Sequence, residues 1–150
     1  MNSLLQKTIK TSSEYAPLVA RLALGIMIFP HGAQKLLGWF GGYGFDGTMQ
    51  FFTSQGMPYA IALLPIIAEF FGALGLITGL LTRVAAFGVG FTMLVASTMH
   101  ASNGFFMNWF GQQKGEGIEF FFLAIGLAIT LMLTGGGALS IDKMLSKNEK

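Results

Sequence analysis

Six ionisable side chains of types used in acid–base chemistry and anion binding fall inside apolar stretches of this sequence. They are Arg21, His31, Lys35, Glu69, His100 and Glu119. Histidine titrates near neutral pH and a carboxylate can exchange protons with it, so the two histidines and two glutamates are candidate catalytic residues. Arginine and lysine would stabilise an anionic ligand. A charge at the centre of a bilayer costs at least about 2.5 kcal/mol, so these groups are expected to meet inside a bundle.

Three interpretations of these groups remain open at the level of sequence. The first is a structural ion-pair network, with Lys35 bound to Glu119 and Arg21 bound to Glu69. The second is a site for a polar headgroup such as a quinone, whose reduction requires protons. The third is a metal or haem site, which ranks last because no Glu-x-x-His pair occurs and the histidines fall at different depths.

The elements that carry these residues are four apolar blocks. They are residues 15–37, 58–81, 83–102 and 118–134. Each is close to the roughly 20 residues that a helix needs to cross a bilayer. Charged residues make up only 11% of the chain, against about 25% in soluble proteins. We therefore expect an all-α fold: one membrane domain, residues 1–150, built as a bundle of four transmembrane helices.

The basic residues predict the orientation of the bundle. Lysine or arginine occurs before the first block, between the second and third, and in the tail 138–150, at Lys7, Lys10, Arg83, Lys143, Lys147 and Lys150. The loops 38–57 and 103–117 contain only Lys114. Because basic residues favour the cytoplasmic side, both termini are expected there and the two loops outside.

Both outer loops are rich in glycine and aromatic residues, and both contain Trp-Phe-Gly. They could form an aromatic belt at the membrane surface or flaps over a cavity. In the second case Trp39 and Trp109 would contact the ligand. Asp46 is expected to cap a short interfacial helix that runs through Gln55, with Met49, Phe51 and Phe52 dipping into the lipid.

Helical spacing places His31 and Lys35 on one face, since they are four residues apart. Arg21 falls on roughly the same stripe but several turns away, near the cytoplasmic end. The other five ionisable groups are expected to form a column in the outer half. Pro30 and Pro65 each free a backbone carbonyl and would bend the helices beside this column.

Other classes of function are excluded or weakened by composition. The chain has no cysteine, so it forms no disulfide and has no thiol chemistry. A net charge of +2 without a basic cluster argues against nucleic acid. No dinucleotide-binding fingerprint is present, so electrons would have to come from a bound cofactor or a partner protein.

The sequence resembles the DoxX family of small four-span bacterial inner-membrane proteins over roughly residues 16–145. The resemblance rests on the segments 21–25, 31–36, 40–47, 99–104 and 139–142, with Glu69, Gly72, Gly79, Thr82, Arg83 and Glu119 between them. It implies a four-helix membrane bundle and a link to quinone-coupled oxidation, because members related to DoxD are associated with thiosulfate:quinone oxidoreductase. It supplies no established set of catalytic residues.

The leading hypothesis is therefore a membrane subunit of a quinone-linked oxidoreductase in the inner membrane. Its pocket would comprise His31, Lys35, Glu69, His100 and Glu119, with the lipid bilayer, a quinone, a soluble redox protein and a second copy of the chain as partners. The alternative is a non-catalytic scaffold or small-molecule carrier whose buried charges are structural. The sequence leaves open whether the chain is an enzyme.

Overall fold

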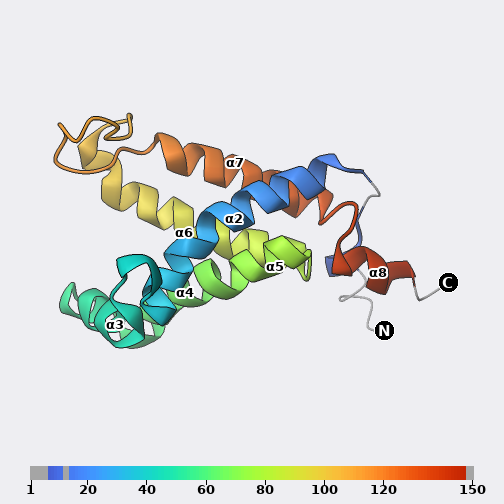
Figure 1. Ribbon diagram of the computed structural model, residues 1–150, viewed down its shortest axis with the longest axis horizontal. Helices are drawn as coiled ribbons and strands as arrows, with labels where there is room; N and C mark the ends of the chain where they lie inside the picture. Colours follow the sequence, from blue (N-terminus) through green and yellow to red (C-terminus); the bar gives the residue numbers. More distant parts are fainter. Residues whose placement is uncertain (1–6, 12–13, 148–150) are drawn as a thin grey trace.

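The computed structural model describes residues 7–11 and 14–147, and in that part of the chain the fold is all-α, without strands. Its elements are α2 (Ala16–Leu37), η1 (Trp39–Gly41), α3 (Gly44–Ser54), α4 (Tyr59–Ile67), the π turn η2 (Ala68–Gly72), α5 (Ala73–Thr78), α6 (Thr82–His100), η3 (Ala101–Asn103), α7 (Glu119–Thr134) and α8 (Ile141–Lys147). Figure 1 shows α3 and the loop before α7 at one end of an elongated bundle, with α8 at the other.

Three helical segments are long and apolar enough to cross a membrane: Ala16–Leu37, Tyr59–Thr78 and Thr82–Asn103, with 22, 20 and 22 residues. At 1.5 Å per residue, 20 residues cover the roughly 30 Å hydrocarbon core. The helix α7 is also apolar but has 16 residues, which reach about 24 Å. The four apolar blocks of the sequence are thus confirmed as helices, three of them at spanning length.

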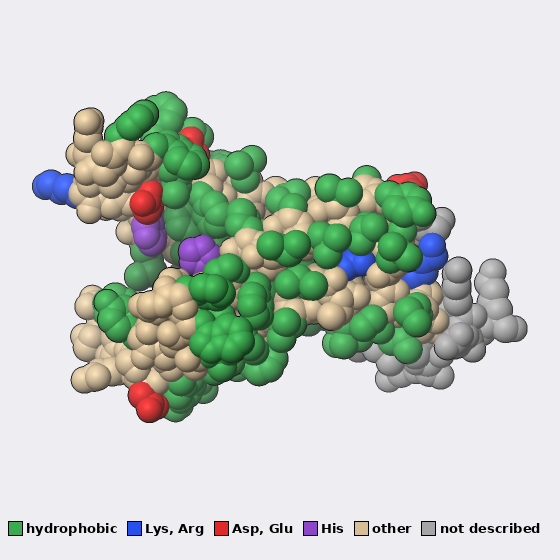
Figure 2. Space-filling view, in the orientation of Figure 1, with side chains coloured by type: hydrophobic (Ala, Val, Ile, Leu, Met, Phe, Trp, Pro, Cys, Tyr) green, Lys and Arg blue, Asp and Glu red, His purple; other side chains and the backbone are tan. Residues whose placement is uncertain are grey.

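The core lies where these helices face one another. Its fully buried members include Leu24 and Ile28 of α2, Leu76 of α5, Val89 of α6 and Leu131 of α7. The outward faces are apolar as well, and Figure 2 shows hydrophobic side chains along most of the visible surface. A bundle that is apolar on both its inside and its outside is suited to a lipid environment.

The helix α2 makes its closest approach to the second helical segment at Gly32. A Cβ atom there would lie 2.5 Å from the carbonyl carbon of Glu69 and from the amide nitrogen of Phe70. Only a glycine allows two backbones to come this close. The contact falls on the π turn that follows Pro65, a widened turn of the kind often found at functional sites.

The loop 38–57 differs from expectation in detail. It contains the expected short helix, but α3 begins at Gly44, and no side chain caps it. Asp46 instead lies in the first turn, where its negative carboxylate interacts favourably with the positive end of the helix dipole. Met49 is buried against Ala62 and Ile66 of α4, so the prediction that it enters the lipid was wrong. The helix folds back onto α4, so Met49 and Phe52 pack against protein, whereas Phe51 is 53% exposed.

Candidate functional site

An ion pair joins α2 to the π turn. The Nζ atom of Lys35 lies 2.5 Å from Oε2 of Glu69, and the two side chains are 25% and 6% exposed. Glu69 is thus deeply buried, whereas the lysine reaches partly to the surface. The predicted pairs Lys35–Glu119 and Arg21–Glu69 were wrong, because the crossing at Gly32 brings Glu69 to the level of Lys35.

His31 lies one helical turn before Lys35 and within electrostatic range of both members of the pair. Its side chain is exposed. Its ring centroid is 6.4 Å from that of Phe120, at the start of α7. The structure therefore brings together His31, Lys35 and Glu69 from the predicted set and adds an aromatic wall.

His100 lies in the last turn of α6, on the other side of this wall. Its ring is 5.2 Å from the ring of Phe121, which stands edge-on to Phe120 at 5.6 Å. Its Nδ1 atom is 2.9 Å from the carbonyl oxygen of Ala96. The rings of the two phenylalanines thus connect the two histidines. Within the described part of the chain, no ion pair or hydrogen bond joins His100 to Lys35 or Glu69.

A hollow opens between two lobes at the end of the bundle that carries His31 and His100. The first lobe comprises residues 38–58, which include α3, and the second comprises residues 101–118. Figure 2 shows the hollow between the lobes with the histidine side chains, of which the chain has two, at its base. The two histidines, one on α2 and one on α6, therefore face an opening, which we call the hollow.

Glu119 has a different role from the one expected. Its Oε1 atom accepts hydrogen bonds from the backbone N–H of Met107 at 2.8 Å and from the indole Nε1 of Trp109 at 3.2 Å. Trp109 itself is 79% exposed. The carboxylate thus fixes the second lobe to the start of α7 and is occupied by that lobe.

Trp39 belongs to the first lobe and lies in η1, directly after α2. Its indole is 54% exposed and meets the ring of Phe40 edge-on at 6.3 Å. The two predicted ligand-binding tryptophans therefore stand on opposite lobes. Each is accessible from solvent or from the membrane surface.

Arg21 lies at the opposite end of the bundle, as its position on α2 predicted. Its side chain is 1% exposed, and its hydrogen bonds to the described residues go to backbone carbonyls. The acceptors are Gly136, Leu76, Ile77, Ala138 and Leu139, at 2.5–3.3 Å. The guanidinium thus closes the last turn of α5 and the turn before α8, and it does not approach the other predicted site residues.

Asp142 completes this arrangement and was missed by the sequence analysis as a functional group. Its carboxylate accepts from the backbone N–H of Leu81 at 2.7 Å and of Thr82 at 2.9 Å, and so caps the start of α6 from α8. Its own N–H donates to Gly79. We call Arg21, Asp142 and the turns they bind the Arg21 clamp. A lone acidic residue in a polar tail gives no signal of this role.

Within the described residues, no three His, Asp or Glu side chains come close enough together to hold a metal ion. The pair at Lys35 and the histidine beside it offer hydrogen-bond donors and a buried carboxylate. This chemistry suits a polar organic group or the movement of a proton.

Comparison with known proteins decides the family. The family model described as DoxX matches residues 16–101, which include the Lys35–Glu69 pair, His31, His100 and Arg21. The chain belongs to the DoxX family. This confirms the resemblance found in the sequence.

Three curated relatives of this DoxX protein align over most of its length. "Inner membrane protein YqjF" of Escherichia coli (strain K12) is 34% identical over 92% of this chain and 98% of its own. "Putative oxidoreductase CatD" of Bacillus subtilis (strain 168) is 30% identical over 93% of each. "Inner membrane protein YphA" of Escherichia coli (strain K12) is 28% identical over 84% and 87%. No solved structure matches the chain.

These relatives and the apolar helices together give the location of the DoxX protein. It is a multi-pass protein of the bacterial inner membrane. The expected contact with the lipid bilayer follows directly.

Proposed function

We propose that the chain is the membrane subunit of a quinone-linked oxidoreductase system and that the hollow receives the quinone headgroup. The observation that carries the proposal is the exposed imidazole of His31 at the hollow, one turn from the buried Lys35–Glu69 pair. A relative of similar length bears the name of an oxidoreductase, which supports this class of function.

The residues present fit such a headgroup. A quinone is a flat ring whose two carbonyl oxygens accept hydrogen bonds. The imidazole of His31 and the partly exposed ammonium of Lys35 can donate to them, and the ring of Phe120 beside His31 offers an aromatic surface. Phe120 belongs to α7 and His31 to α2, so the site would lie between helices, as ligand sites in bundles commonly do.

The contribution of the chain to the reaction would be binding and proton transfer. A quinone that accepts two electrons and two protons becomes a quinol. His31 would deliver one proton at the headgroup, take up another from water through its exposed side chain and so supply both protons in turn. The ammonium of Lys35, paired with Glu69, would orient the headgroup by hydrogen bonding. The electrons would come from a soluble redox protein or a bound cofactor, because the sequence has neither cysteine nor a dinucleotide fingerprint. His100 would line the base of the hollow, and Glu119, Trp39 and Trp109 would shape its rim.

The proposal includes the topology of the chain. The segment 7–11, the 79–82 turn and α8 meet at one end, since Arg83 binds the carbonyl of Lys10 and Asp142 binds the turn. If both ends of the described chain lie on the same side of the membrane, the chain must cross the membrane an even number of times. The helix α7 would then be the fourth span of a bundle that forms a single domain. The basic residues at this end favour the cytoplasm. A homo-oligomer stays a prediction.

The alternative function is a non-catalytic scaffold or carrier. One observation favours it: the buried charges have partners without any ligand. Lys35 and Glu69 neutralise each other, and Arg21 is held by carbonyls. Such a pair can have a purely structural role, in which it fixes the register of two helices.

The two tryptophans provide the test, because they stand on the two lobes and are the only ones in the chain. The full chain in lipid nanodiscs would be titrated with a short-chain ubiquinone or menaquinone analogue while indole emission is recorded. Saturable quenching is expected, and Trp39→Phe and Trp109→Phe variants would each lose part of the signal.

The decisive variant is His31→Ala, with Gln50→Ala on the exposed face of α3 as the matched control. Loss of one hydrogen bond should weaken quinone binding about tenfold in His31→Ala and leave the control unchanged. Quenching that never saturates, or that is equal in both variants, would reject the quinone site and favour the scaffold or carrier.

A further inference from the structure

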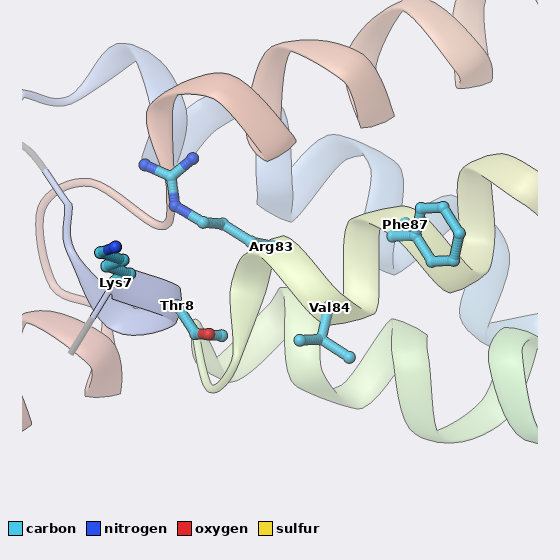
Figure 3. A pocket seen from close by; sticks show the side chains of 5 residues that line it. All are labelled: Lys7, Thr8, Arg83, Val84 and Phe87. Atoms are coloured by element: carbon cyan, nitrogen blue, oxygen red, sulfur yellow. The ribbon is translucent and has the colours of Figure 1, made fainter. Parts of the chain in front are cut away.

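A second recess lies at the opposite end of the bundle from the hollow. It has a volume of about 330 Å³ and is lined by Lys7, Thr8, Arg83, Val84 and Phe87. Figure 3 shows the first two side chains on the N-terminal segment and the other three on the first turns of α6. The side chains of Lys7, Thr8 and Arg83 thus line one part of the recess, and Val84 and Phe87 line the other.

The charge of Arg83 is available to a ligand. Its guanidinium donates to the backbone carbonyls of Lys10, Met132 and Leu133. These contacts fix the group between the N-terminal segment and the end of α7, but each acceptor is an uncharged carbonyl. Lys7 lies on the other side of the recess with its side chain exposed. The two cations are therefore positioned about one space.

An apolar stripe runs from this space along α6. Val84, Phe87 and Phe91 follow one another at intervals of three and four residues, and they are 55%, 60% and 54% exposed. This spacing places them on one face of the helix. The rings of Phe87 and Phe91 stack at 6.1 Å with an interplanar angle of 22°. Because α6 is long enough to span the membrane, the stripe leads from the recess into the lipid.

We propose that this recess binds an anionic phospholipid, with its phosphate between Lys7 and Arg83 and an acyl chain along Val84, Phe87 and Phe91. Basic recesses at the ends of membrane helices attract acidic headgroups, and the attraction falls off within a Debye length. A soluble phosphate could pair with the two cationic side chains but would make no contact with the apolar stripe. A zwitterionic lipid would use the stripe but carries an ammonium that the cations repel. The proposal is independent of the hollow and of any quinone chemistry.

The test is native mass spectrometry of the full chain released from detergent micelles, titrated in turn with phosphatidylglycerol, phosphatidylethanolamine and glycerol 3-phosphate. Phosphatidylglycerol is expected to bind at least about fivefold more tightly than phosphatidylethanolamine, the effect of about one basic residue at a membrane surface. Glycerol 3-phosphate at equal concentration should not displace it. Displacement would identify a soluble anion site and overturn the lipid proposal.

The variants separate the recess from a general attraction to basic residues. Lys7→Gln should lower phosphatidylglycerol affinity about fivefold, whereas Lys10→Gln, an exposed lysine on the same segment that does not line the recess, should leave it unchanged. Equal loss in both variants would reject a defined site. Phe87→Ala tests the stripe, and Phe122→Ala, which removes an equally exposed ring from α7, is its control. Equal affinity in these two variants would show that no acyl chain follows α6.

Discussion

The ammonium of Lys35 and the carboxylate of Glu69 meet at 2.5 Å where α2 crosses the π turn. The pair is asymmetric, since the glutamate is almost fully buried and the lysine is a quarter exposed. A buried pair contributes little net free energy while intact, but the loss of one partner leaves an unpaired charge. The two members should therefore respond differently to substitution.

Lys35→Met should be the more damaging change. It leaves the Glu69 carboxylate unpaired in an apolar core, at a cost of about 3 kcal/mol of unfolding free energy. Glu69→Gln should cost about 1 kcal/mol, because the lysine can extend toward the hollow. The double variant should recover most of the loss. Unfolding in mixed detergent micelles measures all three, and equal losses in the single variants would contradict the asymmetry.

Gly32→Ala should separate the two helices that the ion pair joins. The added methyl group would lie 2.5 Å from the backbone of the π turn, which cannot yield without moving the helix. We expect a loss of about 2 kcal/mol and a weaker response to Lys35→Met in that background. Gly126→Ala is the control, since a Cβ atom there meets no atom within 4 Å. This control should be neutral or slightly stabilising, because alanine is the better helix former.

Arg21→Lys should be strongly destabilising although it preserves the charge. A lysine has three donors on one nitrogen and cannot reach carbonyls on both turns of the clamp. Loss of two or more charged hydrogen bonds should cost about 3 kcal/mol. Arg83→Lys, at a half-exposed position with carbonyl acceptors, should cost less than about 1 kcal/mol. Thermal unfolding of the two variants side by side gives the comparison.

Glu119→Ala should loosen the second lobe without unfolding the bundle. The amide of Met107 and the indole of Trp109 lose their acceptor. Hydrogen–deuterium exchange of residues 104–117 should become at least about fivefold faster, in line with one lost charged hydrogen bond. Glu116→Ala, which releases only the amide of Asn108, is the matched control. Unchanged exchange in Glu119→Ala would show that other contacts hold the lobe.

The helices could be predicted from sequence because their signal is local. Apolar blocks near 20 residues long, ended by glycines, are sufficient to locate α2, the α4–α5 segment, α6 and α7. The position of Arg21 at the far end from His31 follows from helical rise alone. These features require no knowledge of which helix touches which.

The pairing of charges could not be predicted in the same way. Depth inferred from the sequence assumes straight and parallel helices, whereas the π turn and the crossing at Gly32 bring Glu69 to Lys35. The partners of Arg21 are backbone carbonyls, which any residue carries, so no pattern in the sequence marks them. Glu119 was assigned to the column, but the second lobe folds back and binds it.

The Arg21 clamp also bears on how the protein is made. Its acceptors at Gly136 and Leu139 follow Arg21 by 115 and 118 residues, so they leave the ribosome only after α7 has been made. Until then, the guanidinium of Arg21 lacks these acceptors. We expect this charged group to stay near the membrane surface, where a charge costs the least free energy. The clamp thus couples the position of α2 in the bilayer to the synthesis of residues 136–139, and a chain that stops before residue 136 would lack three of the acceptors that hold α2 in place.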